Sequence, residues 1–262
     1  MSEDFDENEN TIIRPSLNGF LGLVSFSTRI PVTRYLTIEQ MAASVILWPY
    51  LGLLVGLVAA IVCYISNHIL GFSLLLTSTI VYCFLIWFGG FNHADGVMDM
   101  GDGLMSHGTK ERKLEIMRDS MVGTGGIATF FIISVLTIVA LSDVGANHLL
   151  ATIVLVEACS KLSMITSMLY GSNDSSGIGR QIKKGMDYRV LVFDSLVLML
   201  LGYPFLGYAS VVGVIGSVVF GFYISYVAQK NFGCVTGDIM GSASEMGRLF
   251  TLICIVVALN LL

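Results

Sequence analysis

Charged residues are scarce in this sequence. Asp, Glu, Lys and Arg make up only 13% of its 262 residues, whereas 55% are hydrophobic, and the mean hydropathy is +0.80. Soluble domains carry about 25% charged residues. The composition therefore excludes an ordinary soluble domain and predicts a polytopic membrane protein.

Several familiar signals are also missing. Residues 1–16 are polar and acidic, so they lack the basic end and hydrophobic core of a signal peptide and predict a solvated tail. The five cysteines form no CxxC pair and four lie in apolar segments, which indicates small core residues rather than disulfides or a zinc site. Neither a Walker loop nor a hydrolase triad is present. We expect no nucleic-acid partner.

Long apolar runs are abundant, and seven of them suffice to cross a bilayer at about 20 residues each. A shorter run from Leu17 to Pro31 contains glycine and ends in Arg29 and Pro31, which favours an interfacial or re-entrant helix. We therefore predict an all-α fold, a polytopic membrane helix bundle in which residues 17–262 form one integral-membrane domain of about seven transmembrane helices plus this N-terminal helix. The predicted spans are residues 44–66, 72–91, 125–142, 149–169, 190–206, 208–229 and 247–262.

Lys and Arg are absent from alternate loops, near residues 67–71, 143–148 and 202–207. By the positive-inside rule the basic loops are cytoplasmic, so the N-terminus is expected inside and the C-terminus outside the cell membrane. Because the outer loops are short, the active site is expected on the cytoplasmic side. One lysine, Lys161, falls inside the fourth span, one helical turn from Glu157, and the two are expected to neutralise each other.

Three aspartates, Asp95, Asp99 and Asp102, directly follow the second span. Their i, i+4, i+7 spacing places them on one face of a helix that is expected to continue from that span into the cytosol. Like charges so close together need a cation or a water-filled mouth. Without a sulfur ligand, Mg²⁺ is favoured over zinc. The alternative is a solvated acidic loop, but glycines in the same segment would let a ligand approach the backbone and favour a phosphate site.

The next basic loop supplies groups suited to phosphate. Arg118 is a candidate phosphate fork and Asp119 a further carboxylate, although an isolated Arg-Asp pair is often a surface ion pair. Gly123 and Gly125 lie in a turn whose N–H groups are expected to face an anion at the start of the third span.

Two later loops add candidate substrate-binding residues. Asp238 and Glu245, at i and i+7, suggest a second acidic cluster that joins the first in one composite site. The third basic loop is interpreted either as topogenic charge or as a segment that binds an anionic substrate. Its candidate residues are Gly177, Gly179, Arg180 and Lys183.

Taken together, these segments resemble the cobalamin synthase family, the adenosylcobinamide-GDP ribazoletransferases. The blocks HADG…DG and MRDS..G..G in that order are the most specific part of the resemblance. Two positions depart from the family pattern: Cys234 replaces a glycine, and Arg248 stands where an acid is often found. The resembling segments are FSTRIPV at 26–32, WPYLGLLVG at 48–56, HADGVMDMGDG at 93–103, EIMRDSMVGTGG at 115–126, GIG at 177–179 and TGDIMGSASE at 236–245.

The resemblance implies transfer of the cobinamide phosphoryl group of adenosylcobinamide-GDP to a hydroxyl of α-ribazole or its 5′-phosphate, with release of GMP and a requirement for Mg²⁺. It matches Asp95, Asp99 and Asp102 to the family's acidic motif, which we expect to hold the metal. The hydroxyl proton would go to Asp102, Asp119 or His93, and the sequence does not choose among them. Expected partners are the lipid bilayer and either a second copy of the chain or other cobalamin-pathway enzymes.

Three rival interpretations stay open at this level. A CDP-alcohol phosphotransferase shares the Asp95-Gly96 start but not the longer spacing of its motif. A UbiA-like prenyltransferase matches Asn92, Asp95 and Asp99 but would carry a second such motif. A cation transporter would place acids in the middle of several spans, whereas only Glu157 and Asp194 lie in spans here.

Overall fold

The computed structural model describes residues 15–170 and 187–261, and within these ranges every regular element is a helix. Six helical segments are long and apolar enough to cross a membrane, and the bent pair α4 (Leu74–Phe88) and α5 (Asn92–Met105) makes a seventh if it counts as one span. The predicted polytopic helix bundle is confirmed. The six segments are Val45–Ile69, which contains α3 (Trp48–Tyr64), then α7 (Thr124–Asp143), α8 (Ala146–Tyr170), α10 (Tyr188–Leu206), α11 (Tyr208–Asn231) and α12 (Gly237–Leu261).

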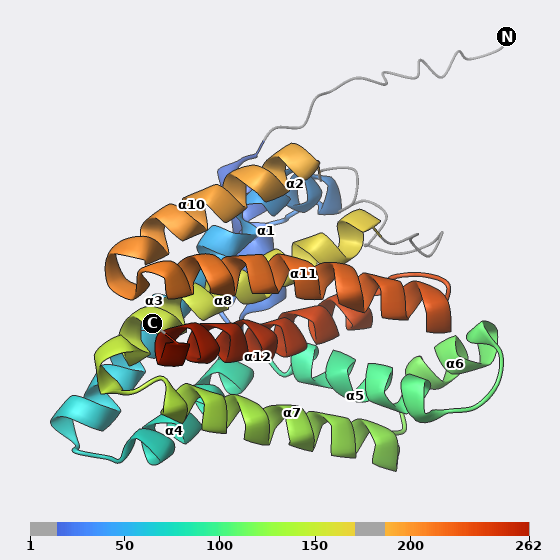
Figure 1. Cartoon of the computed structure of the whole chain (residues 1–262). Helices are drawn as coiled ribbons and strands as arrows, with labels where there is room; N and C mark the ends of the chain where they lie inside the picture. Colours follow the sequence, from blue (N-terminus) through green and yellow to red (C-terminus); the bar gives the residue numbers. More distant parts are fainter. Residues whose placement is uncertain (1–14, 171–186, 262) are drawn as a thin grey trace, which may run out of the picture.

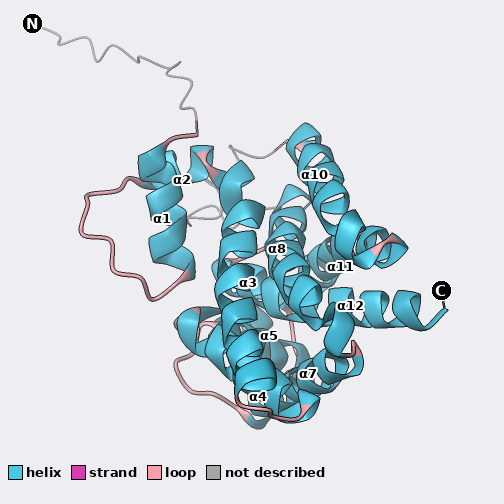
Figure 2. Ribbon diagram, turned by 90° about the vertical axis from the view of Figure 1, so that its left-hand side faces the viewer, coloured by secondary structure: helices cyan, strands magenta, loops and turns pink. Residues whose placement is uncertain are grey.

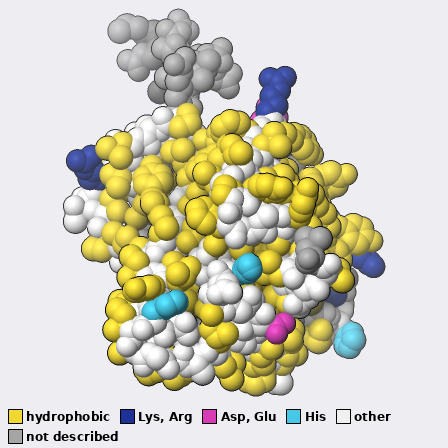
Figure 3. All heavy atoms as spheres, turned by 60° about the vertical axis from the view of Figure 1, so that its left-hand side comes forward, with side chains coloured by type: hydrophobic (Ala, Val, Ile, Leu, Met, Phe, Trp, Pro, Cys, Tyr) yellow, Lys and Arg dark blue, Asp and Glu magenta, His cyan; other side chains and the backbone are white. Residues whose placement is uncertain are grey.

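Helix α8 lies at the centre of the bundle, with α3, α10, α11 and α12 around it (Figures 1 and 2). Its residues are buried on every side from Leu155 to Met168, which is expected of a helix without a polar stripe. The outer helices instead expose large apolar side chains such as Leu57, Phe131 and Leu200. Figure 3 shows hydrophobic side chains over much of one face, as contact with a bilayer requires.

Glycines let α3 lie directly against α8. A Cβ atom added at Gly52 would come within 2.7 Å of the Ala158 Cα atom, and one at Gly56 within 2.7 Å of the Val154 Cα atom. Between helices in a membrane, where apolar burial gives little driving force, such close approach supplies much of the packing energy.

The expectation that the second span continues as one helix into the cytosol is wrong. The chain bends by 91° between α4 and α5. Gly90 (φ +71°) and Phe91 (φ +66°) are both in the left-handed region, which ends α4 and restarts the chain in a new direction. The three aspartates still share a helix, but that helix is α5 alone.

The last span was predicted too short at its N-terminal end. Helix α12 begins at Gly237 rather than at 247, because the segment from Asp238 to Glu245 is the helix's own first turns and not a loop. Glycine and serine make this segment look loop-like in sequence. Their small side chains are buried against neighbouring helices instead.

The N-terminal segment forms α1 (Leu17–Ser27), which is too short to span, and then the six-residue helix α2 (Ile38–Ala43). The Ser27 hydroxyl accepts a hydrogen bond from Trp48 Nε1 at 2.7 Å. The Arg29 N–H donates to the Phe88 carbonyl at 2.8 Å, at the end of α4. This segment therefore docks on the break between α4 and α5. The short helix α6 (Lys110–Met117) follows α5.

The close contact of α3 and α8 gives a stability test. Gly52→Ala should destabilise the protein by about 1–3 kcal/mol, because the added methyl group overlaps the α8 backbone and the helices must separate. The measurement is thermal unfolding of purified protein in detergent. Gly237→Ala is the control, since a Cβ there meets nothing within 4 Å. Equal melting temperatures for the two variants would contradict the packing interpretation.

Candidate active site

Aspartates from two helices gather where α5 lies against the start of α12. The Asp99 carboxylate interacts electrostatically with those of Asp95, Asp238 and Asp102. All four side chains keep some exposure to solvent, and Asp95 is the most exposed. The structure thus joins the predicted α5 cluster to Asp238, as the sequence analysis expected of a composite site.

A glycine makes this meeting possible. A Cβ added at Gly96 would lie 3.1 Å from the Asp238 Cα atom, so α5 and α12 touch at backbone distance. The Ser242 hydroxyl donates to the Gly96 carbonyl at 2.6 Å. Further along the pair, a Cβ at Gly241 would lie 3.2 Å from the His93 Cα atom. The two helices are therefore antiparallel and fixed in register.

The glycines of α5 were expected to let a ligand approach the backbone, and this expectation is wrong. At Gly101 an added Cβ would lie 2.8 Å from Thr129 Cβ of α7, and at Gly103 it would lie 2.7 Å from a ring carbon of Phe232. These positions, like Gly96, are filled by neighbouring helices. Only Gly89 and Gly90 differ, because they form the break.

Asp102 caps helix α7. Its Oδ2 accepts the Gly123 N–H at 2.6 Å and its Oδ1 accepts the Gly126 N–H at 2.8 Å. Gly123, the N-cap residue, has no side chain of its own for this role, and a carboxylate also complements the helix dipole. The turn that was expected to face a substrate anion thus binds an anion from its own chain, and both Asp102 oxygens already have partners.

Arg118 lies at the edge of the aspartate cluster, and Asp119 follows it in the chain. Arg118 ends α6 and interacts electrostatically with Asp238. Both side chains are exposed. The Asp119 Oδ1 atom accepts the Met121 N–H at 3.0 Å. The structure therefore places an exposed guanidinium near Asp238, and a solvent-accessible carboxylate adjoins that arginine in the chain.

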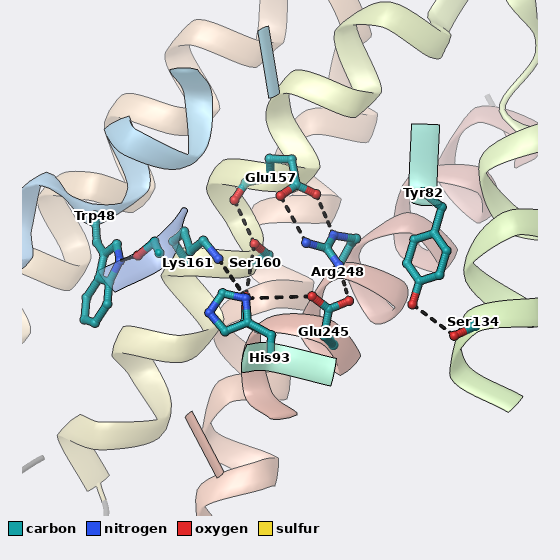
Figure 4. Close-up of polar contacts among 11 residues, drawn as sticks. Trp48, Tyr82, His93, Ser134, Glu157, Ser160, Lys161, Glu245 and Arg248 are labelled. Atoms are coloured by element: carbon teal, nitrogen blue, oxygen red, sulfur yellow. Dashed lines mark hydrogen bonds and ion pairs between the residues drawn. The ribbon is translucent and has the colours of Figure 1, made fainter. Parts of the chain in front are cut away.

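His93 and Glu245 lie elsewhere, in a buried polar network (Figure 4). Glu245 is 2% exposed and forms an ion pair with Arg248, so the expectation that it joins the aspartate cluster is wrong. Asp238 and Glu245 both lie on α12, but Glu245 lies about two turns further along the helix, in the interior of the bundle. His93 is 8% exposed, with Nδ1 3.4 Å from the Lys161 Nζ atom.

The expected direct pair of Lys161 with Glu157 is also not the one formed. Arg248 donates from Nε to Glu157 Oε1 at 2.5 Å and from Nη2 to Oε2 at 3.1 Å, whereas Lys161 donates to the Ser244 hydroxyl at 3.0 Å. Arg248, noted from the sequence only as a departure from the family pattern, is therefore the missed partner of both glutamates. Its pair with Glu245 has the local i, i+3 spacing, but no local spacing could reveal the pair with Glu157, which is 91 residues away.

The remaining candidates cannot be placed. Gly177, Gly179, Arg180 and Lys183 lie outside the described residues. Within residues 15–170 and 187–261, no three His, Cys, Asp or Glu side chains are arranged as a ready metal site. The aspartate cluster nevertheless offers only carboxylate oxygens, the donor type that suits Mg²⁺.

Comparison with known proteins gives a consistent result. Residues 19–256 match the model of the cobalamin-5-phosphate synthase (CobS) family. The adenosylcobinamide-GDP ribazoletransferase of Picrophilus torridus is 33% identical over 94% of this chain and 100% of its own length. Those of Thermococcus kodakarensis (30% identity, 88% of this chain and 95% of the relative) and Clostridium tetani (28%, 92% and 96%) are similar as well. No solved structure matches. The chain belongs to the cobalamin-5-phosphate synthase family.

Proposed function

We propose that this membrane protein is an adenosylcobinamide-GDP ribazoletransferase, which joins adenosylcobinamide-GDP to α-ribazole or its 5′-phosphate and releases GMP. Family membership supports the reaction. The observation that supports its location is the meeting of Asp95, Asp99 and Asp238 beside Arg118. The same membership argues against the CDP-alcohol phosphotransferase, prenyltransferase and transporter interpretations.

Mg²⁺ fits the cluster by donor chemistry, and Asp95, Asp99 and Asp238 are the side chains that would hold it. We include Asp238 and assign Asp102 to the α7 cap instead, because both Asp102 oxygens accept N–H groups. When bound, the ion would neutralise the diphosphate and the charge that develops on the GMP phosphate. Three carboxylates near one another also need such a cation to offset their mutual repulsion.

Side chains of the protein would bind the phosphate and accept the proton. Arg118, exposed at the edge of the cluster, would bind a phosphate oxygen of the diphosphate. The acceptor hydroxyl must lose a proton as it attacks, and Asp119, next to Arg118 in the chain and exposed, is the one of the three predicted acceptors that is not engaged elsewhere. Asp102 is committed to the cap and His93 lies in the buried network. The Met121 N–H binds only the Oδ1 atom of Asp119, so the Oδ2 atom is the one that would accept the proton.

We further propose that the aspartate cluster faces the cytoplasm of a prokaryotic cell membrane. The basic loops at its end of the bundle support this orientation through the positive-inside rule. Lys110, Arg112, Lys113 and Arg118 all lie on or beside α6, which directly follows the acidic helix α5. Self-association and contact with other enzymes of the pathway stay predictions.

The cluster makes a prediction about activity. Asp95→Asn and Asp99→Asn should each lower GMP release from adenosylcobinamide-GDP by about 10²–10³-fold, because each removes one charge from the site that balances the transition state. Enzyme in native membranes is assayed over a range of Mg²⁺ concentrations. Glu111→Gln, an exposed carboxylate on α6, is the matched control. Near-normal turnover of both aspartate variants would refute the assignment.

Asp119 and Asp102 give opposite predictions. Asp119→Asn should lower kcat by about 10²–10⁴-fold through loss of the proton acceptor, with an unchanged melting temperature. Asp102→Asn keeps one acceptor oxygen for α7 and should cost about 0.5–2 kcal/mol of stability. Steady-state kinetics and thermal unfolding of the two purified variants decide between the roles. Full kcat in Asp119→Asn would exclude it as the acceptor.

A further inference from the structure

The buried network contains four charged side chains, from α8 and α12, that are 4% exposed or less: Glu157, Lys161, Glu245 and Arg248. Two are acids and two are bases, so their formal charges cancel. The Arg248 guanidinium donates from Nε and Nη2 to the two oxygens of Glu157 and from Nη1 to Glu245 (Figure 4). Arg248 is thus the one cation in direct ion pairing with both acids.

The depth of this network makes it costly. Glu157 and Arg248 both lie near the middle of 25-residue helices that cross the membrane. Charged groups there lose their hydration, and the mutual attraction of a buried ion pair often only offsets that loss. Well-packed apolar side chains would stabilise such a position equally well. A gain in stability is therefore a poor explanation for the arginine.

The network reaches the active-site helix at its first turn. His93, the second residue of α5, has its Nδ1 atom 3.8 Å from Glu245 Oε1 and 3.4 Å from Lys161 Nζ. It lies two residues after Phe91, which together with Gly90 forms the left-handed turn between α4 and α5. Because the chain breaks there, α4 does not carry its direction into α5. The start of α5 is oriented by what packs against it.

We propose that Arg248 is a positioning residue. Through Glu245 and Glu157 it holds the start of α5 against α12 and α8, and so sets the register in which Asp95 and Asp99 meet Asp238. This proposal rests on the proposed function for its effect on catalysis. Its structural part, the register of α5 on α12, can be measured without any substrate.

The test removes the guanidinium without leaving a buried charge unpaired. The double variant Arg248→Met with Glu157→Gln leaves Glu245 and Lys161 to balance each other. Its melting temperature in detergent should stay near that of the parent protein. Its kcat for GMP release should fall by about 10²-fold, because a displacement of about 1 Å at reacting groups has that effect. KM should change much less than kcat.

The register is measured by cross-linking. Asp95→Cys and Asp238→Cys are introduced together, with and without the double variant, and the rate of disulfide formation is compared. The rate should be several-fold lower in the double variant. The same rate in both backgrounds would overturn the proposal, whatever the activity shows. Absence of GMP release from the parent protein would instead count against the proposed function and leave this comparison valid.

A control separates positioning from the general loss of a buried polar pair. Asp194 of α10 is fully buried and its Oδ1 accepts a hydrogen bond from the Tyr50 hydroxyl of α3 at 3.0 Å. Tyr50→Phe with Asp194→Asn removes that pair at a contact that does not include α5. It should leave kcat and the cross-linking rate unchanged.

If the Arg248→Met background does not fold, Arg248→Lys provides the test. Lysine keeps the charge but not the forked donor geometry, so the cross-linking rate should be intermediate, and a parental rate would overturn the proposal.

Discussion

The antiparallel contact between α5 and α12 determines where the chemistry of this protein can occur. It is a contact between backbones, made possible at Gly96 and Gly241 and fastened by the Ser242 hydroxyl on the Gly96 carbonyl. The acids of α5 and Asp238 come together only because no side chain separates the two helices. Two further interactions flank this contact. The Asp102 cap holds α7 beside α5, and the buried network joins α8 to α12 near the N-terminal end of α5.

Much of the fold could be predicted from the sequence because a bilayer penalises exposed charge and unpaired backbone so heavily. The predicted spans at 125–142 and 208–229 agree with α7 and α11 to within about two residues. The break at Gly89 and Gly90 escaped prediction, because a glycine pair is compatible with a thin continuous helix and with a sharp bend. In the structure the Phe88 carbonyl, which a continuous helix would pair with an N–H four residues onward, accepts the Arg29 N–H instead.

Within the candidate site, the sequence predicted which helix carries the acids more easily than it predicted which group each acid binds. Spacing correctly put Asp95, Asp99 and Asp102 on one helix, since helical periodicity is local. Glu245 has the same spacing from Asp238, yet it pairs with Arg248 in the interior. Likewise, Asp102 points at the start of α7, 21 residues onward. Which oxygen meets which donor depends on helix packing, and a single sequence does not carry that information in any local pattern.

Helix α5 also has an unusual consequence for sequence variation. One of its faces carries the acids, a second meets α12 through Gly96, and a third meets α7 through Gly101. A fourth, at Met100 and Leu104, lines an apolar cavity of about 250 Å³ together with α11 and α12. A helix committed on all sides has few positions at which substitution is neutral. Tolerance to mutation in this protein should therefore be low in this segment of 14 residues and high along the lipid-facing sides of α7 and α10, where one apolar side chain can replace another.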